Sequence, residues 1–512
     1  MARQDAVVAQ VTVSPPLPTS LRDRALRGTA RGGLLNLMGA AVAGVGGLIV
    51  TWLVAYGLGP TTAGRFFAAT SAFLVAVSIA RLGTPTGLIY WVARCRNDPS
   101  AVARVLRSAL LPAAVASIAI GVLAFWAAPH LALWHGDGEQ QYITMLRALA
   151  IFLPAAVAME ALLAATRGFQ RMRATVVVEK LGRTVAQLFL LWVAVSWTTT
   201  LDTGVVVTAA WAVPYLPAGI VAGLWLRRLH TERRAASGGP PTVITPGLFW
   251  AYTVPRAVAG AAHLLLQRMD ILLVAGLLGF AEAALYTVAT RFVTVVRLIS
   301  GAVGSAVQPR LATSMSSADH LTSGALYQVT TGWIVVTGWP ILLSVGWTAP
   351  VYLGLFGAEY VTADGEIVVW LLVCGMLVAT VCGVVDSVLV MAGRTGWQLY
   401  NVVAALIVNL VLNVWLIPDL GIIGAAIAWT VSLAVNNIVP LVQLRTGLGL
   451  HPAGRGTAVA VALSAGWFGV LPALTVLFLG RDAVVAGLAA AGVGMAASAW
   501  RLRKTLILPS YQ

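Results

Sequence analysis

The stretch LVAYGLGPTTAGRFFAAT, from Leu53 to Thr70, aligns without gaps with LVAGLLGFAEAALYTVAT, from Leu273 to Thr290. Eight residues are identical, among them Gly59 and Gly279. Each copy has the pattern of an apolar helix, a turn and a second apolar helix. The spans predicted below place six crossings between the two starts. The copies would therefore share one orientation in a membrane, as expected of two halves related by an axis along the membrane normal.

Apolar stretches of this kind recur along the whole chain. Hydrophobic residues make up 59% of the sequence and charged residues 10%, whereas soluble domains carry roughly 25% charged residues. One helical crossing needs about 20 apolar residues. We predict an all-α integral membrane protein with fourteen crossings, at about 33–57, 63–92, 105–128, 142–165, 174–197, 204–228, 247–278, 283–309, 324–347, 366–391, 397–416, 421–444, 457–479 and 483–501.

The loops between these spans alternate in charge. One set carries arginines such as Arg94 and Arg167, and the other carries acids such as Asp202 and Glu282. Cytoplasmic loops collect Lys and Arg, so we predict a multi-pass membrane protein with both termini cytoplasmic. The same bias accounts for the net charge of +15, and nucleic acid is not an expected partner.

The repeat and the loop charges also divide the chain. We expect two pseudo-symmetric six-helix lobes, joined by the polar, arginine-rich segment from Arg227 to Thr242 and followed by two further helices. The expected units are a disordered cytoplasmic tail at 1–30, an N-terminal lobe at 31–229, a linker at 230–246, a C-terminal lobe at 247–445, and the last two spans with the cytoplasmic C-terminus at 446–512.

Three segments resemble a known family. VAYGLGPTTAGRF followed by IARLGTPTGLIYWVA is similar to the first hairpin of polysaccharide flippases, within the multidrug/oligosaccharidyl-lipid/polysaccharide exporter superfamily. QRMDILLVAGLLGFAEAALYTVATRF resembles the seventh and eighth helices of that family, and NLVLNVWLIPDLGIIGAAIAWTVS its twelfth. The resemblance covers about residues 30–445. It implies a place in the bacterial plasma (inner) membrane and lobes that open alternately to each side. It also implies a lipid-linked glycan as substrate, surrounding membrane lipids, and a glycan polymerase or glycosyltransferases of the same pathway as partners.

The resemblance leaves several functions open. Family members that flip the peptidoglycan lipid precursor usually carry arginines in the first helix, but Leu34 to Leu58 contains no charge. This difference favours a capsule, O-antigen or exopolysaccharide precursor linked to polyprenyl pyrophosphate. A peptidoglycan precursor flippase and an ion-coupled multidrug exporter remain alternatives. An enzyme, such as a membrane glycosyltransferase, is not expected, because the chain has no GK[ST] phosphate loop, HExxH or CxxC. We expect no catalytic residue, cofactor or metal.

Ionisable residues within the spans are the candidates for contact with substrate, because they are costly in lipid and face a wet interior by default. The seventh span carries several on one helical stripe. On this stripe we place Tyr252, Arg256, His263, Gln267 and Asp270. Arg268 is expected to point elsewhere.

In the eighth span, Arg291 lies about ten residues from the outer end, hence roughly 15 Å deep. Planar guanidinium groups bind phosphate oxygens in pairs. We therefore predict Arg291 as the first contact with the diphosphate head group, with Arg297 and Arg256 next. The alternative for Arg291 is an ion pair with Asp270.

Four further residues are candidates for gating. Arg81, Glu160 and Asp386 lie towards the inner ends of their spans, where they would form a cytoplasmic gate or remain interfacial charges. Arg65 lies at the outer mouth, where an arginine departs from the charge bias.

Overall fold

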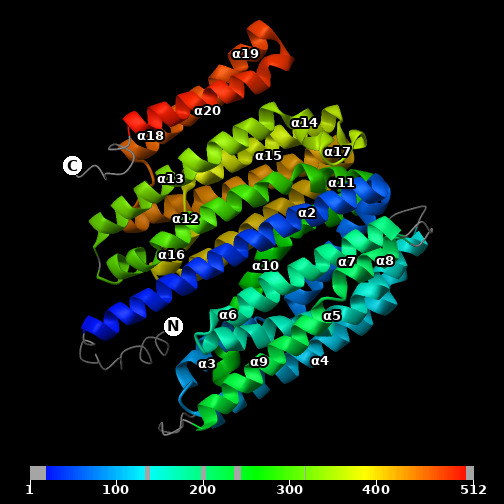
Figure 1. Cartoon of the computed structure of the whole chain (residues 1–512), viewed down its shortest axis with the longest axis vertical. Coiled ribbons are helices and arrows are strands. Elements are labelled where there is room, and N and C mark those ends of the chain that lie inside the picture. Colours follow the sequence, from blue (N-terminus) through cyan, green and yellow to red (C-terminus); the bar gives the residue numbers. More distant parts are fainter. Residues whose placement is uncertain (1–18, 133–138, 198–202, 236–243, 318, 503–512) are drawn as a thin grey trace.

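The computed structural model describes residues 19–132, 139–197, 203–235, 244–317 and 319–502, which form a bundle of long helices (Figure 1). Among them, eleven helices are long and apolar enough to cross a membrane. Two of these, Met38–Ala80 and Thr395–Leu448, each contain a glycine with a non-helical backbone and so make two crossings. One more crossing, at 172–197, is divided among three helical segments. The described chain thus has the fourteen predicted crossings.

The N-terminal lobe provides the first six crossings. Its elements are α2 (Thr19–Ala80), α3 (Thr84–Cys95), α4 (Pro99–Ala132), α5 (Glu139–Gly168), α6 (Met172–Ala174), the π-helix η1 (Thr175–Arg183), α7 (Thr184–Trp197), α8 (Thr203–Ala212) and α9 (Tyr215–Ala235). The helix α2 begins inside the segment predicted as a tail, and residues 1–18 lie outside the described ranges. Part of the predicted linker, at 236–243, also lies outside them.

The C-terminal lobe provides the next six crossings. Its elements are α10 (Pro246–Leu277), α11 (Phe280–Ala289), α12 (Arg291–Ser316), α13 (His320–Trp347), α14 (Ala349–Gly354), the short 3₁₀-helix η2 (Ala358–Tyr360), α15 (Ala363–Cys382), α16 (Val385–Met391) and α17 (Thr395–Leu448). The remaining elements are α18 (Arg455–Ser464), the π-helix η3 (Ala465–Val470), α19 (Leu471–Leu479), η4 (Arg481–Ala483) and α20 (Val484–Arg501). This last pair of crossings packs on α13, at the edge of the bundle (Figure 1).

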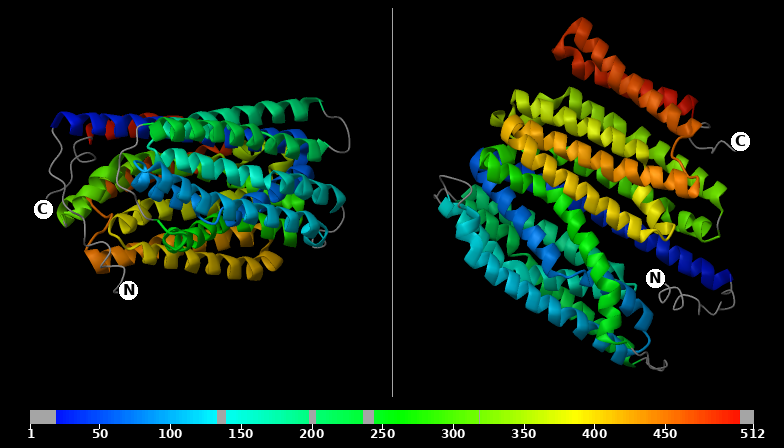
Figure 2. Two further views of the ribbon diagram at one scale, coloured as in Figure 1. Left: turned by 90° about the horizontal axis from the view of Figure 1, so that it is seen from below. Right: turned by 180° about the vertical axis from the view of Figure 1, so that it is seen from behind.

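The two lobes lie side by side, with α2 and α10 between them (Figures 1 and 2). The helix α10 contacts α2 and α3 of the N-terminal lobe as well as α17 of its own lobe. The helix α2 begins, and α20 ends, at the same end of the bundle (Figure 1). We call this end the inner end, because the arginine bias predicts that it is cytoplasmic, and the opposite end the outer end.

The repeated sequence forms corresponding turns in the two lobes. Gly59 (φ 71°) divides α2, and Gly279 (φ 113°) separates α10 from α11. A positive φ is readily adopted only by glycine, which explains why glycine occupies this place in both copies. The two turns lie at the outer end, and the helices that follow them, the second half of α2 and α11, pack against each other.

Candidate functional site

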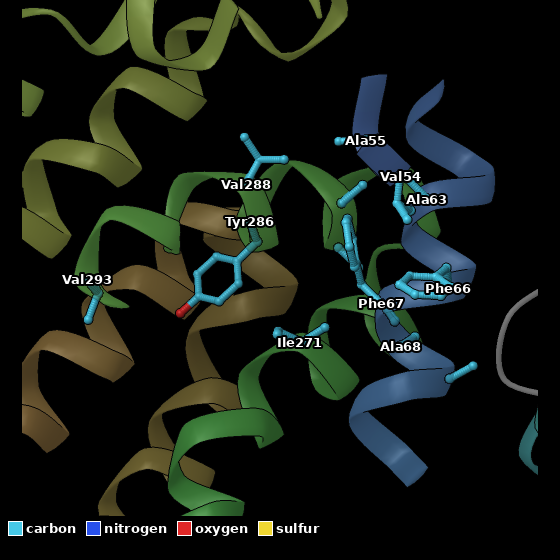
Figure 3. Packing of buried hydrophobic residues seen from close by; sticks show 14 of the residues in the cluster. Val54, Ala55, Ala63, Phe66, Phe67, Ala68, Ile271, Tyr286, Val288 and Val293 are labelled. Carbon is cyan, nitrogen blue, oxygen red and sulfur yellow. The ribbon is translucent and has the colours of Figure 1, made fainter. Parts of the chain in front are cut away.

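The outer end of the interface between the lobes is closed. Gly64 on α2 faces the Phe280 backbone so closely that a Cβ at Gly64 would overlap the Phe280 carbonyl oxygen. The Tyr360 hydroxyl donates a hydrogen bond to the Ala55 carbonyl at 3.3 Å. Figure 3 shows buried side chains of α2, including Phe67 and Ala63, beside those of α10 and α11, such as Ile271 and Val288. We call the contacts of Ala55, Gly64, Phe280 and Tyr360 the outer seal.

Arg65, predicted at the outer mouth, lies beside this seal. Its guanidinium carbon is 5.6 Å from the centre of the Phe280 ring. Its Nη1 donates to the Gln141 side-chain oxygen at 2.6 Å. Arg65 therefore connects α2 and α5 of the N-terminal lobe to the first residue of α11 in the other lobe.

A cavity of about 230 Å³ lies between the lobes. We call it the shared cavity, because both lobes line it. The N-terminal lobe contributes Arg183 and Gln187, and the C-terminal lobe contributes Arg268 and Arg291. The remaining wall is formed by Ala43, Gly46, Gly47, Val50, Thr51, Phe66, Phe67, Thr70, Leu74, Thr184, Trp211 and Tyr215.

Arg291, the predicted first contact with the head group, lies where two cavities meet. It lines the shared cavity and a second, adjoining cavity of about 100 Å³. Its guanidinium carbon is 5.9 Å from the centre of the Phe67 ring of the other lobe. Its buried Nε has no hydrogen-bond partner among the described residues.

The expectation that Arg268 points away from the path is wrong. Arg268 lines both cavities together with Arg291. The residues predicted to share one stripe of α10 contact different neighbours. Arg268 lines both cavities, and Gln267 and Asp270 line the adjoining one. Asp270, 2% exposed, also accepts a hydrogen bond from Asn413 of α17 at 2.8 Å.

Arg183 was missed by the sequence analysis. It closes the π-helix η1, whose wider turns shift the helical phase. Its Nη1 donates to Gln187 at 3.0 Å and to the Tyr215 hydroxyl at 3.4 Å. The available signal was an arginine well inside an apolar span.

The adjoining cavity extends the polar path towards the inner end. Gln267, Thr294 and Arg297 line it, and the Arg297 residue is exposed. The Gln267 side-chain nitrogen lies 2.8 Å from Nε2 of His263, one turn nearer the inner end. Together, Gln267, His263, Thr294 and Arg297 form one polar track that runs from Arg291 towards the inner end.

The predicted ion pair between Asp270 and Arg291 does not form. Asp270 also accepts a hydrogen bond from the Tyr286 hydroxyl at 3.4 Å, and Asn409 donates to Ser432 at 3.3 Å in the same buried cluster. The side-chain oxygens of Asn409 and Asn413 have no donor among the described residues. A carboxylate with free amide oxygens has the ligand chemistry of an oxygen-bound cation, although no group of three or more His, Cys, Asp or Glu side chains gathers in the described chain.

Arg256 and Tyr252 lie outside both cavities. Tyr252 stacks on Tyr90 of α3, with ring centres 4.1 Å apart. Arg256 covers the Tyr252 ring at 3.7 Å and donates to the Tyr252 carbonyl at 2.7 Å. These contacts hold the inner half of α10 against the N-terminal lobe.

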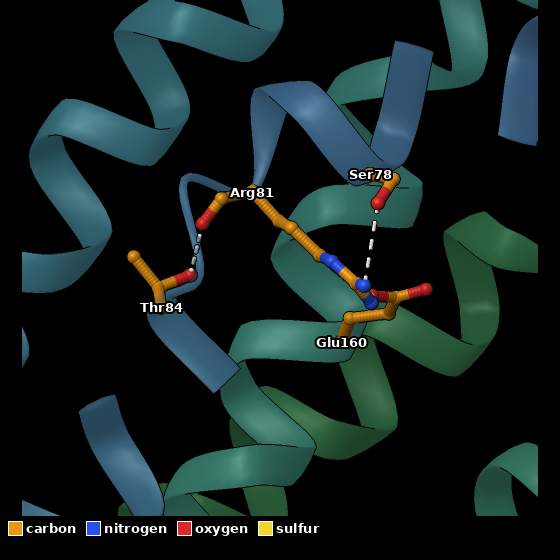
Figure 4. Close-up of polar contacts among 4 residues, drawn as sticks. All are labelled: Ser78, Arg81, Thr84 and Glu160. Carbon is orange, nitrogen blue, oxygen red and sulfur yellow. Dashed lines mark hydrogen bonds and ion pairs between the residues drawn. The ribbon is translucent and has the colours of Figure 1, made fainter. Parts of the chain in front are cut away.

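The predicted inner gate residues do not meet across the lobes. Arg81 pairs with Glu160 at 3.0 Å and also donates to Ser78 at 3.3 Å, all within the N-terminal lobe (Figure 4). Asp386 lies in the first turn of α16 in the other lobe, and its buried Oδ1 has no partner among the described residues.

The site therefore concentrates positive charge between the lobes. The part of the chain that the structure describes contains two ion pairs, Arg81–Glu160 and Arg481–Glu366. No described carboxylate therefore forms an ion pair with Arg183, Arg268 or Arg291. Unpaired charges are costly away from water. The cavity is thus suited to hold an anion, and the charge-assisted hydrogen bonds of guanidinium groups favour carboxylate or phosphate oxygens.

Known proteins share parts of this sequence. A family model described as MatE matches residues 255–415. The probable low-salt glycan biosynthesis flippase Agl15 of Haloferax volcanii is 25% identical over 191 residues, 37% of this chain. The match covers 39% of the length of that curated relative.

Solved structures share the fold at low sequence identity. A lipid II flippase MurJ in an inward closed conformation matches with a TM-score of 0.70 and 9% identity, over 92% of this chain and 99% of its own. An inward-facing multidrug resistance MATE family transporter of the MOP superfamily matches with a TM-score of 0.65 and 14% identity, over 81% of this chain and 98% of its own. Residues 255–415 thus match the MatE family model, within a multi-span helical fold like that of these two solved membrane proteins.

Proposed function

We propose that this transporter is a flippase for an oligosaccharide linked to polyprenyl pyrophosphate, such as a capsule, O-antigen or exopolysaccharide precursor. The observation that carries the proposal is the group of unpaired guanidiniums of Arg268 and Arg291 at the interface between the lobes. A lipid diphosphate supplies the negative charge that this interface lacks. The glycan flippase among the relatives supports the same substrate class.

We expect the head group to enter from the inner end, because the outer end of the interface is closed. The outer seal lies above Arg291, and the track of Gln267, His263 and Arg297 leads from Arg291 towards the inner end. We expect the head group to enter along this track, with its polyprenyl tail left in the bilayer. Opening of the seal and closure of the inner half would then release the glycan outside by alternating access.

Export by arginine variants tests this proposal. In a strain that lacks the gene, we expect Arg291→Ala to abolish glycan export and to leave the abundance of the protein in the membrane unchanged. Arg147→Ala is the matched control, because Arg147 lies on α5 beside Phe125 and lines neither cavity. Normal export by the Arg291→Ala variant would overturn the proposal.

A peptidoglycan lipid precursor is the second candidate substrate. The similarity to MurJ extends over 92% of this chain, more than the 81% covered by the MATE family transporter. Against this substrate, the first half of α2 contributes no charge between Leu34 and Leu58. Identification of the lipid-linked glycan that accumulates in the deletion strain separates the candidates, and an ion-coupled drug exporter would instead give drug sensitivity without any accumulated glycolipid.

A further inference from the structure

Arg183 brings a guanidinium from the N-terminal lobe to a cavity whose other arginines come from the C-terminal lobe. It lies on the fifth crossing, and Arg268 and Arg291 lie on the seventh and eighth. The Tyr215 ring centre, on α9, lies 5.0 Å from the guanidinium carbon of Arg183, and Tyr215 lines the same cavity as Arg268. The shared cavity is therefore cationic on both of its sides.

The position of Arg183 is fixed by its neighbours. Gln187 accepts from Arg183 and itself donates to the Trp211 carbonyl at 2.8 Å, which ties the side chain to α8. The guanidinium carbon of Arg183 lies 5.0 Å from the centre of the Tyr215 ring. Its buried Nε has no partner among the described residues. A guanidinium held in this way loses little conformational entropy when an anion binds.

The carboxylates near this wall are engaged elsewhere or stand apart. Glu160 pairs with Arg81, and Asp270 is bonded to Asn413 and Tyr286. Glu179 lies one turn before Arg183 on η1 but forms no ion pair within the described chain. Its carboxylate oxygens are therefore more than 4 Å from the Arg183 nitrogens. Three guanidiniums thus face a space in which no carboxylate neutralises them.

We propose that Arg183 is the N-terminal half of a two-sided head-group site, through which the transporter selects a diphosphate over a monophosphate. This inference rests on the proposed function. One phosphate satisfies Arg268 and Arg291 on the C-terminal side, and a second phosphate is needed to engage Arg183 on the opposite wall. The cavity of about 230 Å³ between the two walls is the space that we expect the two phosphates to fill.

Such selection has a physical use in a membrane. Ordinary phospholipids carry a phosphodiester head with a single negative charge, and they greatly outnumber any lipid-linked glycan. A site limited to Arg268 and Arg291 would accept them. An additional fixed guanidinium on the opposite lobe favours the head group that carries more charge and reaches both walls.

Anion binding to the purified full-length protein tests the inference. We measure the shift in unfolding temperature with inorganic pyrophosphate and with orthophosphate, at constant ionic strength because salt screens such contacts. The parent protein is expected to respond to pyrophosphate at concentrations about tenfold below those of orthophosphate, a ratio equivalent to ~1.4 kcal/mol. In the Arg183→Gln variant this advantage falls to about threefold or less, while the response to orthophosphate is unchanged.

The control variant is Lys180→Gln, which removes a charge from the same π-helix outside the cavity lining and is expected to keep the full preference. If Arg183→Gln does not fold, Arg183→Lys, which keeps the charge but not the planar group, is expected to lose part of the preference. An undiminished preference in the folded Arg183 variants, or equal loss of both responses, overturns the inference. Failure of the proposed function looks different, because Arg291→Ala would then respond to both anions as the parent does.

Discussion

The hydroxyl of Tyr352 occupies the place where the backbone N–H of Phe292 would otherwise meet a helical carbonyl. It accepts a hydrogen bond from the Phe292 N–H at 3.2 Å and donates one to the Val288 carbonyl at 2.7 Å. A side chain inserted into the helical ladder in this way interrupts a helix. The interruption lies between α11 and α12, and Arg291 is the first residue after it. The direction in which Arg291 points therefore depends on Tyr352.

Removal of that hydroxyl is the first prediction. In Tyr352→Phe, the Phe292 N–H and the Val288 carbonyl are free to bond to each other, so the helix becomes continuous and Arg291 turns. We expect the pyrophosphate needed for a given thermal shift to rise about tenfold, equivalent to ~1.4 kcal/mol, with little change in the unfolding temperature of the empty protein. Tyr400→Phe, at an exposed position, is the control. An unaltered pyrophosphate response in Tyr352→Phe would contradict this account.

The fold was largely predictable, because hydropathy and loop charge report directly on membrane crossings. The repeat even located corresponding turns, since Gly59 and Gly279 both adopt the positive φ that favours glycine. The split of the fifth crossing by η1 was not predictable, because a π-helix has no periodicity that differs clearly from that of an α-helix over nine residues.

The site was predictable only in part. Arg291 stood out as a lone arginine deep in an apolar span. Arg268 was wrongly predicted to point away from the path, because the stripe was drawn for α10 alone. Such a stripe does not reveal that α10 faces a cavity on one side and the amide-rich face of α17 on another. Tyr252 and Arg256 were assigned to the same stripe. Instead, Tyr252 packs on Tyr90 of α3 and Arg256 covers Tyr252, because the inner half of α10 lies against the N-terminal lobe.

The outer seal gives the second prediction. In Gly64→Ala, the added Cβ overlaps the Phe280 backbone, which cannot move aside as a flexible side chain does. The seal should therefore fail to close and export should be lost. Gly492→Ala, on α20, where an added Cβ meets open space and lines neither cavity, is the control. The measurement uses a cysteine placed in the shared cavity, Thr70→Cys. A membrane-impermeant thiol reagent added outside should label this cysteine only in the Gly64→Ala background. Protection in both backgrounds would refute the seal.

The third prediction concerns Arg81 and Glu160, which pair within one lobe (Figure 4). Because this ion pair does not cross the interface between the lobes, we expect it to stabilise the N-terminal lobe and not to act as a gate. We expect the double variant Arg81→Gln/Glu160→Gln to export glycan at nearly the parental rate. Each single variant leaves one partly buried charge unpaired, and the coupling between the two sites should be about 1 kcal/mol in thermal unfolding. Loss of export in the double variant, with stability retained, would instead indicate a gate.

The last prediction tests the buried cluster that joins α10 to α17. Asp270 accepts hydrogen bonds from Asn413 and Tyr286 and is itself 2% exposed. Asp270→Leu leaves the Tyr286 hydroxyl without its acceptor and the Asn413 amide with only the Asn409 carbonyl. A buried polar group left unsatisfied costs about 1–3 kcal/mol, so the unfolding temperature should fall substantially. Asp270→Asn keeps an oxygen acceptor of the same shape and should retain most of the stability. If Asp270→Leu proved as stable as Asp270→Asn, the carboxylate would not be what holds the outer half of α10 to its lobe. Apolar packing would then be what holds this half of α10 against α17.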